Sequence, residues 1–131
     1  MSTTAPSMPP DIQTMRTSVT LVLAADVPKA DPQDPDSRDA PELHFTGAEL
    51  ESLSDTYRDH ITALIPAVEA RAELLPERHA DRVAAMMCVG EARIRLRLGP
   101  GGTDALRGSV ASRLARSVKA LCRHYDRLVS R

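Results

Sequence analysis

Histidine, cysteine and carboxylate side chains that could bind a metal ion or act in catalysis are few and scattered in this chain. At 1.5 Å per residue, His60 lies about 25 Å along its predicted helix from the turn near Glu77. His124 falls near the other end of the predicted bundle, close to that turn. The two histidines therefore cannot share an ion within one monomer. A surface site made by His79, His124 and Cys122 is the alternative, but we expect no metal and no cofactor, because no known ligand spacing is present.

The two cysteines are the candidates for nucleophilic catalysis, and neither has a base beside it. Cys88 falls between two apolar stripes of its predicted helix, and Cys122 flanks the main stripe of the last one. A cysteine in such a position usually acts as a small hydrophobic residue. His124 is two residues from Cys122 and therefore points to another side of the helix. The chain also lacks phosphate-binding and Cys-x-x-Cys motifs, so the sequence favours a non-enzymatic protein and assigns no catalytic residue.

Glu91 is the most polar residue beside the apolar positions of its helix. It could accept a hydrogen bond from Arg58 or His60, which the same count places within a few turns of it. The interpretation that we favour is a half-buried ion pair. The alternative is a small-molecule site or an active site in a pocket between helices, near Pro66, His60 and Glu91. Its ligand-binding residues would be Arg58, His60, Glu91 and Arg95.

Segments with helical periodicity must position these side chains. Over residues 103–128, apolar residues at steps of three or four fall on one stripe of a helix seven turns long: Leu106, Val110, Leu114, Val118, Leu121, Tyr125 and Leu128. Such a helix needs a partner of equal length beside it. A second helix begins with the capping box Thr46–Glu49 and ends at Pro76, with Pro66 on the side away from its apolar stripe.

A third helix is predicted over about residues 79–98, antiparallel to the second, with apolar residues on two faces. The first stripe is Val83, Met86, Met87, Gly90 and Ile94. The second, on the opposite side, is Ala85, Val89, Ala92 and Leu96. Gly90 indicates a close helix crossing, because glycine in a helix costs about 1 kcal/mol. We expect the second stripe to face away from the bundle, where the first helix or a second subunit covers it, and we predict a homodimer with partner-binding residues Val89, Ala92 and Leu96.

The rest of the chain adds a short helix and two irregular segments. Residues 1–10 are expected to be disordered. A first helix runs from Asp11 to Pro28, and residues 27–41, rich in proline and aspartate, form an extended linker. Residues 11–131 are predicted to be one domain, with an all-α fold: an antiparallel helical bundle of three long helices plus the short N-terminal one. No secretory signal or membrane span is visible, so we expect a soluble protein of a reducing compartment.

Charge is unevenly distributed although the net charge is −1. Residues 42–77 hold eight acidic and two basic side chains, and residues 104–131 hold seven basic and two acidic ones. The interpretation that we favour is that the two helices pack together and their charges cancel locally. The alternative is a basic face for an acidic protein partner, with Arg116 and Arg123 among its residues. Nucleic acid is not the expected partner, because no aromatic side chains interleave with these charges.

Four blocks of the sequence carry a resemblance to a known family: Tyr57–His60, Leu64–Glu69, Val89–Leu96 and Leu114–Tyr125. They resemble a family of small actinobacterial proteins labelled as natural product biosynthesis proteins, a domain of unknown function. The resemblance covers about residues 11–26 and 45–128. It implies a cytoplasmic protein encoded at secondary-metabolite loci, and it brings no catalytic residues. We therefore expect a non-enzymatic accessory or regulatory protein of such a locus, which acts by protein–protein interaction.

Overall fold

The computed structural model describes residues 11–25, 45–99 and 101–130. The segment 1–10 and the linker 27–41, for which disorder and an extended chain were predicted, lie outside these residues. The described chain forms four helices, which are α1 (Ile12–Ala25), α2 (Gly47–Ala72), α3 (Ala80–Arg95) and α4 (Asp104–Val129). It contains no strand. The all-α prediction, with three long helices and a short N-terminal one, is confirmed.

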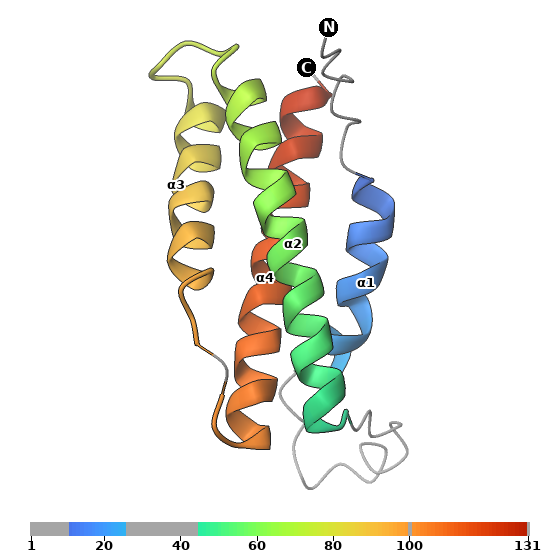
Figure 1. Ribbon diagram of the computed structural model, residues 1–131. Helices are drawn as coiled ribbons and strands as arrows, with labels where there is room; N and C mark the ends of the chain where they lie inside the picture. Colours follow the sequence, from blue (N-terminus) through green and yellow to red (C-terminus); the bar gives the residue numbers. More distant parts are fainter. Residues whose placement is uncertain (1–10, 26–44, 100, 131) are drawn as a thin grey trace, which may run out of the picture.

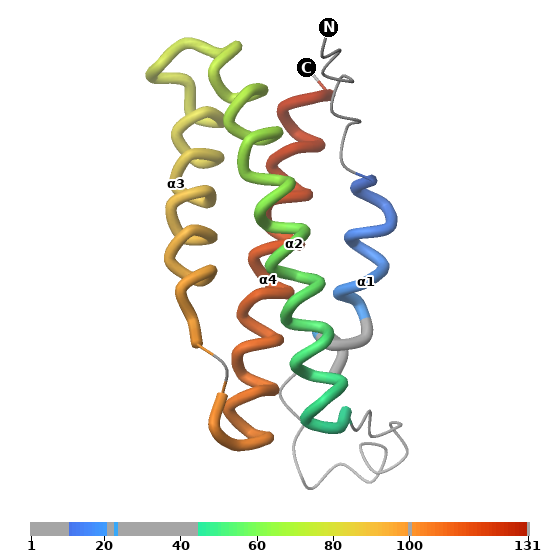
Figure 2. Tube along the Cα trace, viewed as in Figure 1, coloured from blue at the N-terminus to red at the C-terminus, as the bar shows by residue number. Residues whose placement is uncertain are grey.

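The helices are arranged around a central pair formed by α2 and α4 (Figure 1). Successive helices run in opposite directions, so α2 and α4 run in the same direction and begin at the same end of the bundle (Figure 2). α3 packs on both members of the pair, whereas α1 packs mainly on α4. α1 and α3 therefore flank the pair on opposite sides. The long partner expected beside α4 is α2.

The adjacent beginnings of α2 and α4 are capped by side chains. Thr46 Oγ1 accepts a hydrogen bond from the Glu49 backbone N–H at 3.1 Å, and the Glu49 carboxylate accepts one from the Thr46 N–H at 3.0 Å. This is the predicted capping box. In α4, Thr103 Oγ1 accepts from the Leu106 N–H at 3.2 Å. Both helix ends carry partial positive charge, and the acidic side chains of Glu49 and Asp104 in the first turns offset their repulsion.

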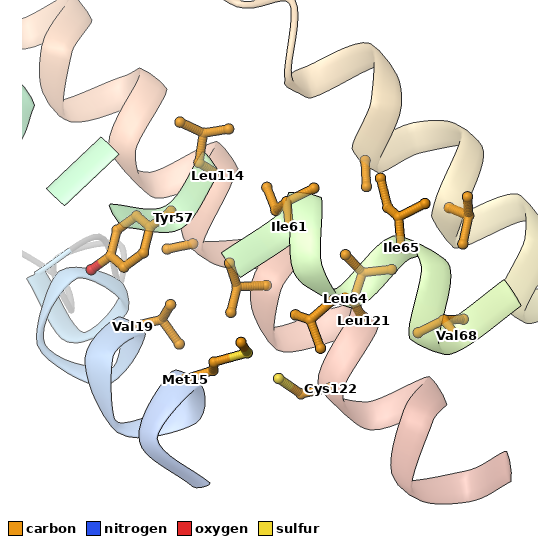
Figure 3. Packing of buried hydrophobic residues seen from close by; sticks show 14 of the residues in the cluster. Met15, Val19, Tyr57, Ile61, Leu64, Ile65, Val68, Leu114, Leu121 and Cys122 are labelled. Carbon is orange, nitrogen blue, oxygen red and sulfur yellow. The ribbon is translucent and has the colours of Figure 1, made fainter. Parts of the chain in front are cut away.

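The core lies between the facing sides of α2 and α4 (Figure 3). Its largest fully buried side chains include Tyr57, Ile61 and Leu64 of α2 and Leu114 and Leu121 of α4. The predicted stripe of α4 is buried at Leu114, Val118, Leu121 and Leu128, and partly buried at Val110 and Tyr125. Its first member, Leu106, is exposed instead. α3 ends short of the first turns of α4, so the loop between α3 and α4 rather than a helix lies beside Leu106 (Figure 1).

The two faces of α3 are the reverse of what periodicity predicted. Ala85, Val89 and Ala92, the stripe expected to face away from the bundle, are fully buried. They lie in the chain's own core, so the prediction that this stripe meets a second subunit through Val89 and Ala92 is wrong. The physical reason is that α3 packs on two helices at once, and small side chains let it approach both closely. Leu96, at the end of this stripe, is half-buried against the same core.

The stripe expected to face the core is largely in water. Val83 is 46% exposed, and Met87 and Ile94 are each 65% exposed. Gly90 is exposed too, and a Cβ added there would meet no atom within 4 Å. No other helix in the described part of the chain crosses α3 at Gly90, so the close crossing predicted from this glycine is not an intramolecular one.

α1 packs on its own chain, on the side of α4 away from α3. Arg16 forms an ion pair with Asp126 and donates a hydrogen bond to the Cys122 carbonyl at 3.5 Å. The Tyr57 hydroxyl donates to the Ser18 carbonyl at 2.7 Å and ties α1 to α2 as well. Met15 is buried beneath these contacts. Because α1 lies on the far side of α4, it covers neither stripe of α3, contrary to one of the two arrangements that the sequence left open.

Candidate functional site

A pocket of about 450 Å³ opens at the end of the bundle where α2 and α4 begin. α2, α4 and the loop between α3 and α4 supply its walls. The lining residues are Glu51, Ser54, Asp55, Arg58, Leu98, Gly101, Arg107 and Val110. Its two guanidinium groups and two carboxylates balance in charge, and apolar atoms make up the larger part of the lining. The lining includes no imidazole and no thiol, and Ser54 supplies its hydroxyl group.

Arg107 joins the two central helices at one wall of this pocket. Its Nη1 donates to Asp104 Oδ1 at 2.8 Å, and its Nε lies 3.2 Å from Glu51 Oε1. The buried Nε makes no well-aligned hydrogen bond, so the contact with Glu51 is an ion pair rather than a directed bond. The first residue of α2, Gly47, packs against the same group: a Cβ there would lie 2.8 Å from the Asp104 carboxylate. The network therefore belongs to the packing of α2 on α4.

Arg58 holds another wall of the pocket in place. Its Nη1 donates to Asp55 Oδ1 at 3.1 Å, and its Nη2 donates to the Leu98 carbonyl at 3.1 Å. The second bond anchors the loop between α3 and α4 to α2. Since both arginines of the pocket already have acidic or carbonyl partners, a charged ligand would have to replace these contacts. The pocket suits a small polar molecule better than a strongly charged one.

The four ligand-binding residues predicted from the sequence do not converge. Only Arg58 lines the pocket, and its acidic partner is Asp55 rather than Glu91, so the favoured ion-pair interpretation is wrong for Arg58. Glu91 is exposed on α3. Arg95 donates instead to Ser117 Oγ on α4 at 2.9 Å. Residue counting placed these residues at similar positions along the bundle axis. It did not give the rotation of each helix about its own axis, and that rotation directs their side chains to different surroundings.

His60 is half-buried on α2 and lies near Tyr57, with the two ring centroids 6.5 Å apart. Its Nε2 is buried and finds no hydrogen-bond partner among the described residues. Desolvation lowers the pKa of His60, while the charge of Asp59 acts in the opposite direction. Burial therefore favours the neutral form of the imidazole. No hydrogen bond or ion pair within the described chain joins it to Glu91, so the predicted acceptor role of Glu91 toward His60 is not realised in the structure.

Both thiols are in surroundings that suppress the thiolate. Cys122 is fully buried between α1 and α4, and burial raises its pKa to about 11 (Figure 3). Cys88 is half-buried, and its pKa is raised by desolvation and then by the charge of Glu91. A reactive cysteine needs a lowered pKa and access to solvent. These surroundings agree with the interpretation of both residues as small hydrophobic side chains.

The most exposed apolar surface on a helix is the outward side of α3. We call Val83, Met87, Gly90 and Ile94 the α3 outer stripe. Leu74, in the turn before α3, is 75% exposed and adds to the apolar surface at that end of the bundle. Of the six large hydrophobic side chains exposed in the described chain, three are on this stripe. The spacing of four, three and four residues places the stripe on one helix face, and exposed apolar surface gathered on one face can mark a contact site.

Comparison with known families places the chain in one of them. A family profile matches residues 13–130, which is most of the chain and includes nearly all of α1 and the whole of α2, α3 and α4. The chain belongs to the DUF6415 family. This family is described as one of unknown function. No curated protein and no solved structure matches the chain. The resemblance to a domain of unknown function is thereby confirmed at that level.

The DUF6415 match covers the pocket and the α3 outer stripe alike, and it assigns a role to neither. Within the part of this DUF6415 domain that the structure describes, no group of three or more histidine, cysteine or acidic residues could hold a metal ion. In the same part of the domain, no helix is long and apolar enough to span a membrane.

A basic surface lies on the outward side of α4 in the DUF6415 domain. Its exposed members are Arg113, Arg116, Lys119, Arg123 and Arg127. The pKa of the half-buried His124 is lowered by desolvation and then by the charges of Arg127 and Arg123. A partner-binding role for Arg116 and Arg123 stays a prediction.

Two parts of the DUF6415 domain were missed from the sequence. The ion pair of Arg107 with Glu51 depends on the parallel arrangement of α2 and α4, which no local motif specifies. The only local signal was the spacing of Asp104 and Arg107, three residues apart on one helix face. The α3 outer stripe was seen as a stripe but was assigned to the core.

Proposed function

We propose that the chain is a non-enzymatic helical protein that acts by protein–protein interaction, with the α3 outer stripe as its contact surface. The observation that supports this proposal is the exposure of Val83, Met87 and Ile94 along one side of a helix whose opposite side is fully packed. Apolar side chains in water favour association, because covering them releases the cost of hydrating them. A protein surface that covers this stripe is the partner we expect.

The polar groups of the bundle support a binding role over a catalytic one. In the pocket, Arg58 is paired with Asp55, and Arg107 is paired with Asp104 and lies beside Glu51. The first and second of these pairs lie within α2 and within α4, and the contact of Arg107 with Glu51 joins the two helices, so these charges have structural partners inside the bundle. The raised pKa values of the two thiols point in the same direction.

The sequence resemblance suggests the biological process in which this interaction takes part. We propose that the chain is a cytoplasmic accessory or regulatory protein of a secondary-metabolite biosynthetic locus. Its supports are the four blocks of similarity to actinobacterial natural product biosynthesis proteins and the small number of chemically reactive groups in the described chain. The partner would be an enzyme or regulator encoded at the same locus, or a second copy of this chain.

Site-specific photo-crosslinking tests the proposal in cells that express the chain at its native level. A photoreactive side chain at position 87 or 94 is expected to trap a protein, because both positions are well exposed on the α3 outer stripe. Ala63, exposed on α2 away from α3, is the matched control position. Adducts at positions 87 and 94 but not at 63 would support the proposal. Absence of any protein adduct on α3, or equal labelling at position 63, would overturn it.

A second candidate function is the binding of a small polar molecule in the pocket between α2 and α4, near Arg58 rather than near His60 and Glu91. The volume of about 450 Å³ and the mixture of donors and acceptors favour it. A thermal-shift screen of small polar metabolites tests this candidate. A compound that raises the melting temperature of the wild type, but not of a Val110→Phe variant whose ring would fill the pocket, would support it. A screen without any such compound would contradict it.

A further inference from the structure

We propose that the α3 outer stripe is the two-fold contact between two copies of this chain, in which the two α3 helices lie antiparallel and Met87 of one copy sits over Gly90 of the other. This inference deepens the proposed function and rests on the α3 outer stripe being a protein contact. It also moves the predicted homodimer from the inner face of α3 to its outer face.

The spacing of residues along the outer stripe allows two copies of the stripe to pack against each other. From Val83 the outer residues follow at steps of four, three and four, and this order reads the same in both directions. When a second α3 lies antiparallel against the first, Val83 of each copy lies opposite Ile94 of the other. Met87 of each copy likewise lies opposite Gly90 of the other. Each large side chain of the middle pair therefore faces the residue with no side chain. Two-fold contacts require this kind of self-complementary surface.

Gly90 differs from Gly108, which also lies within a helix, in lying among exposed apolar side chains on the same helix face. A glycine in the middle of a helix destabilises it relative to alanine, and proteins usually keep one where another backbone approaches closely. No atom of the described chain lies within 4 Å of the place where its Cβ would be. A second α3 could therefore approach at the short end of the usual range of helix distances, about 8 Å between axes. The flexible Met87 side chain suits the hollow that Gly90 leaves.

Charges at the two ends of α3 favour the antiparallel arrangement. Arg97 is exposed near the C-terminal end, where Arg93 is already paired with Glu69 of its own chain. An antiparallel contact brings Arg97 of each copy toward the exposed Glu73 and Glu77 in the turn before the N-terminal end of the other. Arg71 and Arg78 offset much of the acidic charge of that turn. The opposed helix dipoles add to the attraction, whereas two parallel α3 helices would place like ends together.

The size of the contact predicts a weak dimer. From Val83 to Ile94 the stripe is about 16 Å long at 1.5 Å per residue. One helix face of this length buries well under the ~800 Å² per partner of interfaces of standard size. We therefore expect dissociation in the micromolar range or above, so that monomers and dimers exchange at accessible concentrations.

Sedimentation equilibrium on the purified full chain, from low micromolar to several hundred micromolar, tests the inference. The wild type is expected to show a monomer–dimer equilibrium. Gly90→Ala should weaken dimerisation at least five-fold, because the added methyl group lies in the contact, yet it should raise the melting temperature of the dilute protein. Gly108→Ala is the matched control, since Gly108 is also within a helix and also has open space at its Cβ position. It should raise the melting temperature and leave dimerisation unchanged.

Met87→Gln is the second variant, and it should also weaken dimerisation at least five-fold. A wild type that is monomeric at all these concentrations would overturn the inference, and so would a dimer that neither Gly90→Ala nor Met87→Gln weakens. If either of these two results is accompanied by a photo-crosslink from position 87 to a different protein, the dimer is contradicted and the proposed function is supported. If position 87 labels no protein at all, both the dimer and the proposed function are contradicted.

Discussion

Gly101 is held against the first turns of α4 more closely than any other residue type would permit. A Cβ added there would lie 2.4 Å from the Arg107 backbone nitrogen and 2.5 Å from the Leu106 carbonyl carbon. Backbone atoms of a helix cannot move aside cheaply, so the loop between α3 and α4 would have to shift. Gly101 is one of three glycines that lie close together in this loop. The structure separates Gly101 from Gly99 and Gly102, whose Cβ positions are open.

We predict that Gly101→Ala lowers the free energy of unfolding by about 1–3 kcal/mol, the usual cost of forcing extra atoms into a packed site. Gly102→Ala is the matched control and should change it by no more than about 0.5 kcal/mol. Urea denaturation of the two variants measures the difference. Equal stabilities would show that the loop does not press on α4 at Gly101.

Tyr57 is the residue at which burial has its clearest effect on pH dependence. Its side chain is fully buried, its hydroxyl donates to the Ser18 carbonyl, and burial raises its pKa to about 12 (Figure 3). In the unfolded chain a tyrosine loses its proton near pH 10. The stabilising effect of the buried neutral phenol is therefore complete below pH 10 and is lost as the pH rises toward 12.

We predict that the free energy of unfolding falls by up to about 1.4 kcal/mol per pH unit in this range because of Tyr57. Cys122, with a pKa raised to about 11, adds a similar fall that begins near pH 9. The difference between the wild type and Tyr57→Phe isolates the tyrosine. The variant should lose about 1 kcal/mol at pH 7 with the hydrogen bond to α1, and its stability should fall less steeply above pH 10. Parallel curves in urea titrations at pH 7, 10 and 11 would contradict this account.

At the scale of helices, most of the bundle follows from the sequence and one helix does not. Capping residues and prolines predicted where the helices begin and end to within a few residues, and the single apolar stripe of α4 faces the core from Leu114 onward. α3 offered two stripes. The outer stripe was expected to face the core, but close packing on two helices at once selects small residues such as Ala85 and Ala92. The periodicity of apolar residues alone carries no information about the distance between packed helices.

A pair of substitutions on α3 tests which face is buried. Val89→Asp places a charge in the core of a single chain and should lower the free energy of unfolding by several kcal/mol. Met87→Asp, two residues earlier on the outer stripe, should change it by about 0.5 kcal/mol or less in dilute protein. Thermal unfolding followed by circular dichroism compares the two variants. A folded Val89→Asp with an unfolded Met87→Asp would mean that the orientation of α3 is reversed.

At the scale of the whole molecule, the arrangement of the helices around α4 decides which surfaces are left for function. The all-α class and the order of the helices were predictable, because each long helix needs a partner and short turns force neighbours to be antiparallel. The side on which α1 packs was not predictable, because residues 26–44 separate it from α2 and permit either flank. Most of the candidate site was not predicted, since only Arg58 of the four predicted ligand-binding residues lines the pocket.

With α1 on one flank and α3 on the other, no helix of the described part of the chain covers the outer stripe of α3. We propose that this stripe faces water in the monomer and is covered by protein when the chain acts. Methionine methyl groups report on it directly, because Met87 lies on the stripe, whereas Met15, on the inner side of α1, is buried in the core.

The most direct measurement is the effect of a soluble paramagnetic probe on methyl-labelled methionine, followed by nuclear magnetic resonance at increasing protein concentration. Met87→Leu and Met15→Leu variants assign the two resonances. We predict that in dilute protein the probe broadens Met87 strongly and leaves Met15 sharp, and that the broadening of Met87 decreases as the protein associates. A Met87 resonance that is sharp even in dilute protein would contradict the orientation of α3. A Met87 resonance that stays equally broadened at every protein concentration would contradict the role of the α3 outer stripe as a contact between two copies of the chain.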